Sequence, residues 1–280
     1  LTLFGGVILL IAFLLIEKKS KHPMMPLYLF ANPIFTGVNL LTFFLYAGLG
    51  AGMLFLSLNL VQVQGYSQLQ SGLTFLPFTV LMITIARFAG ALADKYGPRL
   101  LLIIGPAAAG AGLLILSFVR QTAGPTEYWT TFFPGIIVFG LGMSFTVAPL
   151  TATVMTSVND HLSGTASGVN NALTRISNVF ANAIFGALAV LLFSGALQDR
   201  LQSIPLPTEA KQSVVRQAAN LGNAKVPNSI DPQYEKAISR SYRESFIHAY
   251  SGIMKISAGL GFLGALMAVI FIRNKTLKKQ

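Results

Sequence analysis

The sequence predicts an all-α, polytopic membrane protein, and three features of the 280-residue chain support this prediction. Hydrophobic residues make up 53% of the chain and charged residues only 10%, whereas soluble domains carry about 25% charged residues. The mean hydropathy is +0.64. The apolar residues also form stretches as long as a bilayer is thick, and the connectors between these stretches hold the charges.

Seven apolar stretches follow one another along the chain. A helix of about 20 residues crosses the hydrocarbon core of a bilayer, and six of the stretches reach this length: 34–61, 73–93, 100–119, 129–155, 166–193 and 246–272. Residues 1–16 carry no charge but are too short to cross alone, so we expect them to be the end of a truncated helix. In lipid only helices and closed barrels pair the whole backbone, and the ten-residue alternation of a barrel does not occur in this sequence.

The connectors form two sets, because successive connectors of such a protein lie on opposite sides of the membrane. One set includes the linker 17–33 and the tail 273–280, and it holds nine basic residues: Lys18, Lys19, Lys21, Lys95, Arg99, Arg273, Lys275, Lys278 and Lys279. Excess Lys and Arg marks the cytoplasmic side. The other set contributes Arg120 and the long polar stretch 194–245, whose seven basic residues are a weak topological signal because of its length. We expect 194–245 to be extracytoplasmic, with short helices near 208–220 and 232–244.

The residue types present exclude several kinds of active site. The chain has no Cys, so it offers no thiolate nucleophile, disulfide or Cys-ligated metal. None of the nine acidic residues falls in the middle of a predicted span, and His22, His161 and His248 stand at span edges. We therefore predict no enzyme, no catalytic residue, no metal and no cofactor. We expect the basic residues behind the net charge of +11 to contact anionic lipid headgroups and not nucleic acid.

The most informative motif is the run Gly90-Ala91-Leu92-Ala93-Asp94-Lys95-Tyr96-Gly97-Pro98-Arg99, which joins two spans almost directly. Gly90 would permit close helix approach, and Gly97 would permit a left-handed backbone. Asp94 is expected to accept bonds from backbone N–H groups or to pair with Lys95 or Arg99. A capped helical hairpin with ordinary flanking charges would explain part of the same run.

This run resembles the Gly-x-Leu-Ala-Asp-Arg-x-Gly-Arg signature found between the second and third helices of each half of major facilitator superfamily transporters. The resemblance implies that 34–272 is the six-helix C-terminal half and that the loop at Asp94 is cytoplasmic. It also implies that Asp94, with Lys95 and Arg99 as basic neighbours, takes part in a charge network between the halves. Pro98 departs from the signature, because the family often has a basic or polar residue there.

Softer patterns are similar to the fourteen-helix drug:proton antiporters of that superfamily. They are the segment 17–35, the run Gln62-Val63-Gln64-Gly65-Tyr66-Ser67, and Gly168-Val169-Asn170-Asn171 with Arg175. This family has two extra helices between its halves, which would account for 1–16. The resemblance implies alternating access driven by a proton gradient, with the proton carried by residues of an N-terminal half that this sequence does not contain.

Polar residues inside the spans are unfavourable in lipid and are therefore candidate transport residues. Helical spacing places two sets on one face each: Asn171, Arg175, Asn178 and Asn182 in span 166–193, and Asn39, Phe43, Tyr46 and Met53 in span 34–61. The resemblance places the second set at the central cavity. Hydrogen bonds between packed helices, or plain packing, would also explain these residues. We expect Arg175 to meet a carbonyl, water or a carboxylate of the other half.

These patterns together predict solute transport across the cell membrane, with the C-terminus in the cytoplasm. Proton-coupled efflux of lipophilic or cationic drugs is the leading hypothesis, and its partners are a small-molecule substrate, the bilayer and the N-terminal half. A major facilitator transporter of a defined metabolite, such as a sugar or an organic acid, is the alternative and would require several convergent charges. A non-transporting membrane scaffold or receptor is the second alternative.

Overall fold

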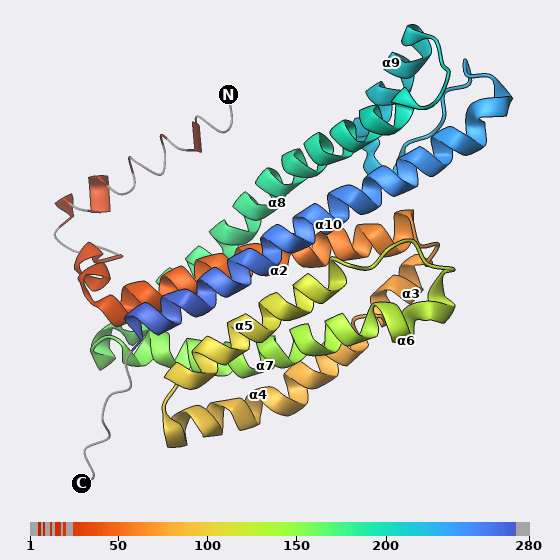
Figure 1. Cartoon of the computed structure of the whole chain (residues 1–280). Coiled ribbons are helices and arrows are strands. Elements are labelled where there is room, and N and C mark those ends of the chain that lie inside the picture. Colours follow the sequence, from red (N-terminus) through yellow and green to blue (C-terminus); the bar gives the residue numbers. More distant parts are fainter. Residues whose placement is uncertain are drawn as a thin grey trace.

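The computed structural model describes residues 25–272, together with residues 5, 6, 8, 12, 15–17, 19 and 20. Within this part of the chain every regular element is helical (Figure 1). Six of the described helices are long and apolar enough to cross a membrane, which confirms the predicted fold class. Most of the predicted helix end at 1–16, and all of the predicted tail at 273–280, lie outside the described residues.

Most of the long helices begin at or beside a proline. In chain order they are η1 (Leu27–Ala31), α2 (Pro33–Gln62), α3 (Gln68–Leu73), α4 (Leu76–Tyr96), α5 (Arg99–Leu116), η2 (Pro125–Glu127), α6 (Tyr128–Thr131), α7 (Phe133–Thr156), η3 (Asp160–Leu162), α8 (Ser163–Gln202), α9 (Thr208–Arg216), η4 (Gln217–Asn223) and α10 (Pro232–Phe271). Before α2, the Asn32 side chain accepts a hydrogen bond from the N–H of Ile34 at 2.9 Å. Before α10, the Asp231 carboxylate accepts from the N–H of Gln233 at 2.9 Å. Both are N-caps followed by proline at the first helical position, a pairing that fixes the start of a helix.

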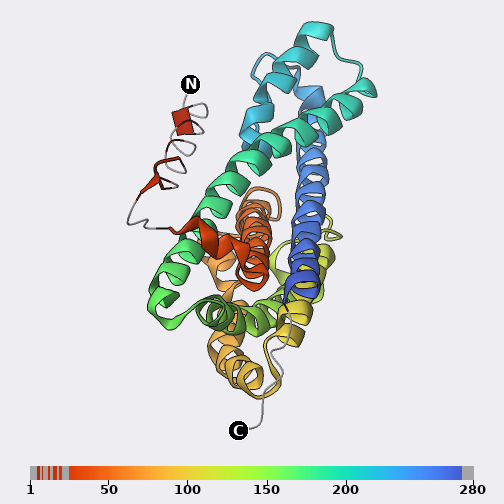
Figure 2. The same cartoon turned by 90° about the vertical axis from the view of Figure 1, so that its left-hand side faces the viewer.

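Four helices form the interior of the bundle and two lie at its edges. Helix α5 packs against α7 and α10, and α10 also packs against α2 and α8. Helix α4 packs mainly on α7, so that α4 and α8 lie at opposite edges of the bundle (Figures 1 and 2). The apolar core is therefore built from α2, α5, α7 and α10, and the edge helices bury only part of their surface.

Glycines allow the interior helices to touch backbone to backbone. A Cβ added to Gly142 of α7 would overlap the backbone nitrogen of Ala109 in α5 and lie 2.6 Å from the Gly105 carbonyl oxygen. A Cβ on Gly261 of α10 would lie 2.9 Å from the Cα of Gly110 in α5. Membrane helices associate through such close van der Waals contact, because lipid gives them no hydrophobic drive to pair.

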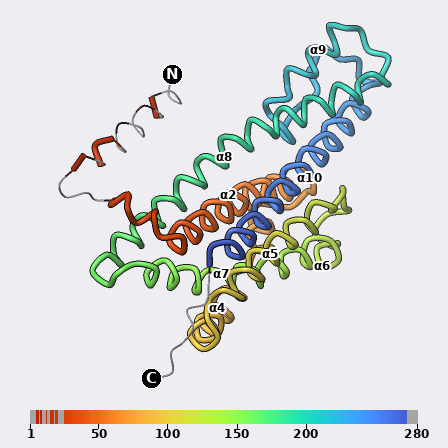
Figure 3. Tube along the Cα trace, turned by 60° about the vertical axis from the view of Figure 1, so that its left-hand side comes forward, coloured from red at the N-terminus to blue at the C-terminus, as the bar shows by residue number. Residues whose placement is uncertain are grey.

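Helices α8 and α10 both extend into the predicted long connector 194–245. Helix α8 continues to Gln202 and α10 already begins at Pro232, so this end of the pair extends beyond the other helices (Figures 1 and 3). Two contacts hold the extension together. The rings of Phe193 and Tyr242 stack with centroids 6.3 Å apart, and Arg200 pairs with Glu244 at 3.3 Å. The predicted helix near 232–244 is present as the first part of α10, and α9 with η4 covers 208–220.

The run Gln62–Ser67 ties the connector after α2 to the connector after α5. The buried Gln64 side chain accepts hydrogen bonds from the N–H and the hydroxyl of Thr122, both at 2.9 Å, and donates to the carbonyl of Arg120 at 3.1 Å. Gly65 supplies a φ of +75°. Ser67 forms a capping box with Gln70 at the start of α3. This run therefore has a structural role.

Candidate functional site

The polar stripe that the sequence predicts on α8 is largely uncovered. Asn171, Arg175 and Asn182 are exposed, and a Cβ on Gly164 or Gly168 would meet nothing within 4 Å. We call these five residues the α8 polar stripe. Among the described residues Arg175 has no hydrogen-bond or ion-pair partner, since both ion pairs found there involve Glu244.

Arg175 lies deep in the predicted membrane region. It follows Ser163, the first residue of α8, by twelve residues, or about 18 Å along the helix. The hydrocarbon core is about 30 Å thick, so this position is near its middle. A cation there is strongly unfavourable in lipid, and such residues face water or protein instead. The α8 polar stripe therefore requires an aqueous or protein environment.

A second exposed stripe on α8 is apolar. Phe180, Ile184 and Leu191 are 48%, 59% and 69% exposed. Phe180 follows Arg175 by five residues, and at 3.6 residues per turn the two side chains diverge by about 140°. One helix thus presents two faces with opposite solvent preferences, a polar one suited to water and an apolar one suited to lipid.

Asn178 lies at the interface between α8 and α2. Its Oδ1 lies so close to Gly50 that a Cβ there would overlap it, and its Nδ2 donates to the Thr174 carbonyl at 2.9 Å. Asn170, which the sequence-based selection missed, accepts a hydrogen bond from the Thr42 hydroxyl of α2 at 2.7 Å. The signal for Asn170 was available: it begins a stripe of small and polar residues, at spacings of four, three and four, that ends at Ala181.

The candidates on α2 are less exposed than those on α8. Asn39 is buried; its Nδ2 donates to the Phe35 carbonyl at 2.8 Å, and its Oδ1 has no partner among the described residues. Phe43, Tyr46 and Met53 are half-buried. The contact between Gly50 and Asn178 sets this face beside α8, so the two predicted sets adjoin each other.

The two glycines of the Asp94 motif differ in what the structure requires of them. Gly97 has φ 86° and ψ 152°, a backbone conformation that is essentially restricted to glycine. Its N–H donates to the carbonyl of Ala93 at 2.8 Å, which ends α4. A Cβ on Gly90 would lie 3.7 Å from the Cβ of Ala148, an ordinary contact distance. The described helices therefore require glycine at 97, and they leave room for a side chain at 90.

The predicted pairing of Asp94 with Lys95 or Arg99 is wrong for the described residues. Asp94 is exposed and has no hydrogen bond or ion pair there. Lys95 lies over the ring of Tyr96, 5.1 Å from its centroid. Arg99 donates instead to the carbonyl of Val269 in α10 at 3.3 Å. The reason is geometric: Asp94 lies in the last turn of an edge helix, whereas Arg99 begins an interior helix.

Comparisons with known proteins agree with these features. The family model of the Major Facilitator Superfamily matches residues 1–182. The chain is 23% identical over 272 residues to the tetracenomycin C resistance and export protein of Streptomyces glaucescens, covering 95% of this chain and 49% of that protein. Against multidrug resistance protein 3 of Bacillus subtilis the identity is 26% over 267 residues, covering 91% and 50%. The multidrug transporter protein MdtP of Bacillus subtilis is 28% identical over 192 residues, covering 69% and 35%. The chain thus spans half the length, or less, of these curated relatives.

Proposed function

Because this chain belongs to the major facilitator superfamily, we propose that it is part of a pump that exports lipophilic or cationic drugs in exchange for protons. The chain is a multi-pass membrane protein of a transporter family and not an enzyme. Distant similarity to drug resistance and export proteins, over as much as 95% of the chain, supports the choice of drugs as substrates.

The observation that carries the proposal is the α8 polar stripe. It places an unpaired arginine near mid-membrane on an open face, with one asparagine about one turn before it and another about two turns after it. Beside it, α2 contributes two half-buried aromatic rings and a methionine, which suit greasy substrates of varied shape. In the proposed mechanism this face lines one wall of a central path, and a second half supplies the opposite wall and alternates access.

The proton-titrating group is proposed to lie outside this sequence. Proton coupling requires a carboxylate or imidazole that titrates within the membrane. None of the nine acidic residues of this chain lies in the middle of a predicted span. Arg175 would then face that carboxylate, or a water-filled cavity, in the assembled transporter.

The proposed orientation puts the loop at Asp94 and the C-terminus in the cytoplasm. The distribution of nine Lys and Arg residues supports it through the positive-inside rule. Asp94 has no partner among the described residues, and this leaves its carboxylate available for the other half.

A second candidate function follows from the sign of the charge on the α8 polar stripe. Its one charged residue is a cation, which favours an organic anion over a cationic dye as the bound solute. A major facilitator exporter of an organic acid is therefore the alternative. The two functions differ in which solute a proton gradient drives out of the cell.

Accumulation of ethidium in cells that produce the full-length protein tests the proposal. We expect these cells to hold several-fold less ethidium than cells with an empty vector, because export opposes passive entry. A protonophore should abolish the difference within minutes. Equal accumulation in the two strains would contradict drug efflux, and a difference that survives the protonophore would contradict proton coupling. Expulsion of a fluorescent organic acid but not of ethidium would favour the alternative.

A further inference from the structure

A second surface feature lies at the opposite end of the bundle from Asp94. Two adjoining hollows, with volumes of about 640 and 580 Å³, share Gln121 and Glu244 and follow one face of α10. Their charged lining residues come from α10, from the end of α8 and from the connector after α5. These residues, which we call the basic groove, are Arg120, Arg200, Glu235, Lys236, Arg240, Arg243, Glu244 and Lys255.

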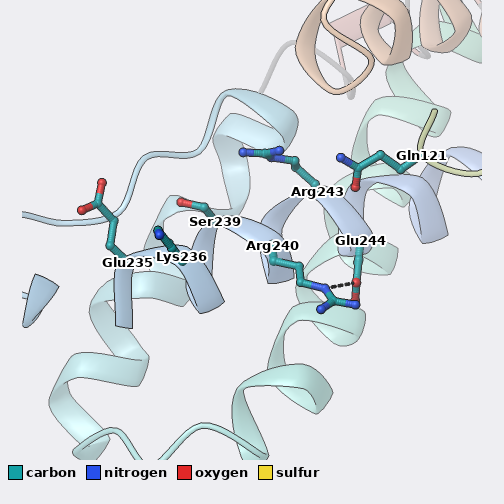
Figure 4. A pocket seen from close by; sticks show the side chains of 7 residues that line it. All are labelled: Gln121, Glu235, Lys236, Ser239, Arg240, Arg243 and Glu244. Atoms are coloured by element: carbon teal, nitrogen blue, oxygen red, sulfur yellow. Dashed lines mark hydrogen bonds and ion pairs between the residues drawn. The ribbon is translucent and has the colours of Figure 1, made fainter. Parts of the chain in front are cut away.

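The basic groove carries a surplus of positive charge. Six of its charged side chains are basic and two are acidic. Glu244 is already occupied, since its carboxylate pairs with Arg240 at 2.7 Å and with Arg200 at 3.3 Å. Figure 4 shows the Arg240–Glu244 pair and the Arg243 side chain, which reaches away from it. The remaining cations have no acidic partner among the described residues, so the groove favours an anionic ligand.

The groove begins at the edge of the predicted hydrocarbon layer. The contact between Arg99 and Val269 puts the start of α5 and the end of α10 at one level. From that level, Phe118 lies about 28 Å away along α5 and Lys255 about 21 Å away along α10, at 1.5 Å per residue. The Lys255 ammonium lies 5.9 Å from the centroid of the Phe118 ring. Since the hydrocarbon core is about 30 Å thick, Phe118 and Lys255 lie roughly 2 and 9 Å short of its far boundary. The long Lys255 side chain can extend towards the phospholipid headgroups there.

The face of α10 that carries the groove changes character at Lys255. Towards the membrane centre the same face continues through Gly259, Phe262 and Leu266, at spacings of four, three and four residues. A Cβ on Gly259 would meet nothing within 4 Å, and Phe262 and Leu266 are 41% and 46% exposed. One continuous surface is therefore cationic at headgroup depth, where Lys255 and Arg120 lie, and apolar at acyl-chain depth.

We propose that the Lys255 end of the basic groove, which Arg120 also lines, binds the headgroup phosphate of an anionic phospholipid, with the acyl chains lying along Phe262 and Leu266. Arginine and lysine form charge-assisted hydrogen bonds with phosphate oxygens, and the apolar stripe below supplies the contact that a free phosphate ion would not use. The site is independent of the transported solute. A failure of the lipid-binding proposal would therefore leave the drug-efflux proposal unaffected, and the reverse also holds.

Native mass spectrometry of the detergent-purified full-length protein measures this binding directly. The probes are phosphatidylglycerol and phosphatidylcholine with identical acyl chains. The test variant is Arg120→Gln with Lys255→Gln, since both side chains are exposed and only the Arg120 carbonyl takes part in the Gln64 contact. The matched control is Arg216→Gln with Lys225→Gln, which removes the same charge from exposed positions outside the groove.

Phosphatidylglycerol is expected to bind the unaltered protein about tenfold more tightly than phosphatidylcholine. The test variant should lose about tenfold in phosphatidylglycerol affinity, since each basic residue near a membrane surface strengthens attraction several-fold, and the control should keep it within about twofold. Equal affinity for the two lipids, or an equal loss in the two variants, would overturn the proposal. So would displacement of the lipid by millimolar inorganic phosphate, because the site would then recognise the free ion. If the test variant has a lower unfolding temperature than the unaltered protein in phosphatidylcholine, the single variant Lys255→Gln replaces it.

Discussion

Gly142→Leu is expected to prevent the bundle from folding. A Cβ at this position would overlap the backbone nitrogen of Ala109 and lie 2.8 Å from the Ala108 carbonyl carbon, and neither atom moves by a simple rotamer change. The α5–α7 contact would have to open, at a cost of about 3 kcal/mol or more. Size-exclusion chromatography of the full-length protein fused to a fluorescent protein measures the result as loss of the monodisperse peak.

The control for this prediction is Gly195→Leu in α8. A Cβ on Gly195 would meet nothing within 4 Å, so the same substitution should change the unfolding temperature by only a few degrees. Equal, near-normal yields of folded Gly142→Leu and Gly195→Leu protein would show that the close α5–α7 contact does not exist.

Arg175→Gln is expected to lower transport at least about tenfold while leaving the amount of protein in the membrane unchanged. Arg175 has no partner among the described residues, so its removal breaks no contact within this bundle. In the assembled transporter it would lose its interaction with a substrate, water or a carboxylate at mid-membrane depth. The rate of ethidium efflux from preloaded cells, divided by protein abundance, is the measurement.

Two companion variants give the Arg175 prediction its specificity. Arg216→Gln removes an exposed arginine from α9, outside the membrane-length stretches, and should transport normally. Arg175→Lys keeps the charge and should restore part of the rate if charge is the essential property. A wild-type rate in Arg175→Gln would rule out a role for this residue in transport.

Hydropathy alone predicted the six long helices but not all of their ends. Hydropathy indicates where an apolar segment ends. A helix can continue beyond that point when it packs against a neighbouring helix. The stretch 194–245 shows this, since the stacked Phe193 and Tyr242 and the Arg200–Glu244 pair carry α8 and α10 past their apolar segments. Both contacts join residues more than forty positions apart, and no pattern within either segment predicts such a pairing.

The sequence predicts which face of α8 carries the candidate residues, but not which of these residues a neighbouring helix covers. Spacing placed Asn171, Arg175 and Asn182 on one face of a helix, and all three are exposed in the structure. It did not separate them from Asn178, which faces Gly50 of α2, because only the position of the neighbouring helix decides which side of a stripe is covered. That Asp94 has no partner among the described residues was unpredictable for a similar reason, since its surroundings depend on how α4 sits at the edge of the bundle.

Cysteine accessibility along α8 tests most directly whether its polar stripe lines an aqueous path. This sequence has no cysteine, so single cysteines can be placed at Asn171, Asn182, Phe180 or Ile184 in a full-length protein freed of any others. A water-soluble thiol reagent reacts with the thiolate, which forms only where water reaches. We expect labelling at 171 and 182 to be at least about tenfold faster than at 180 and 184. Equal labelling at all four positions, or faster labelling at 180 and 184, would contradict the account.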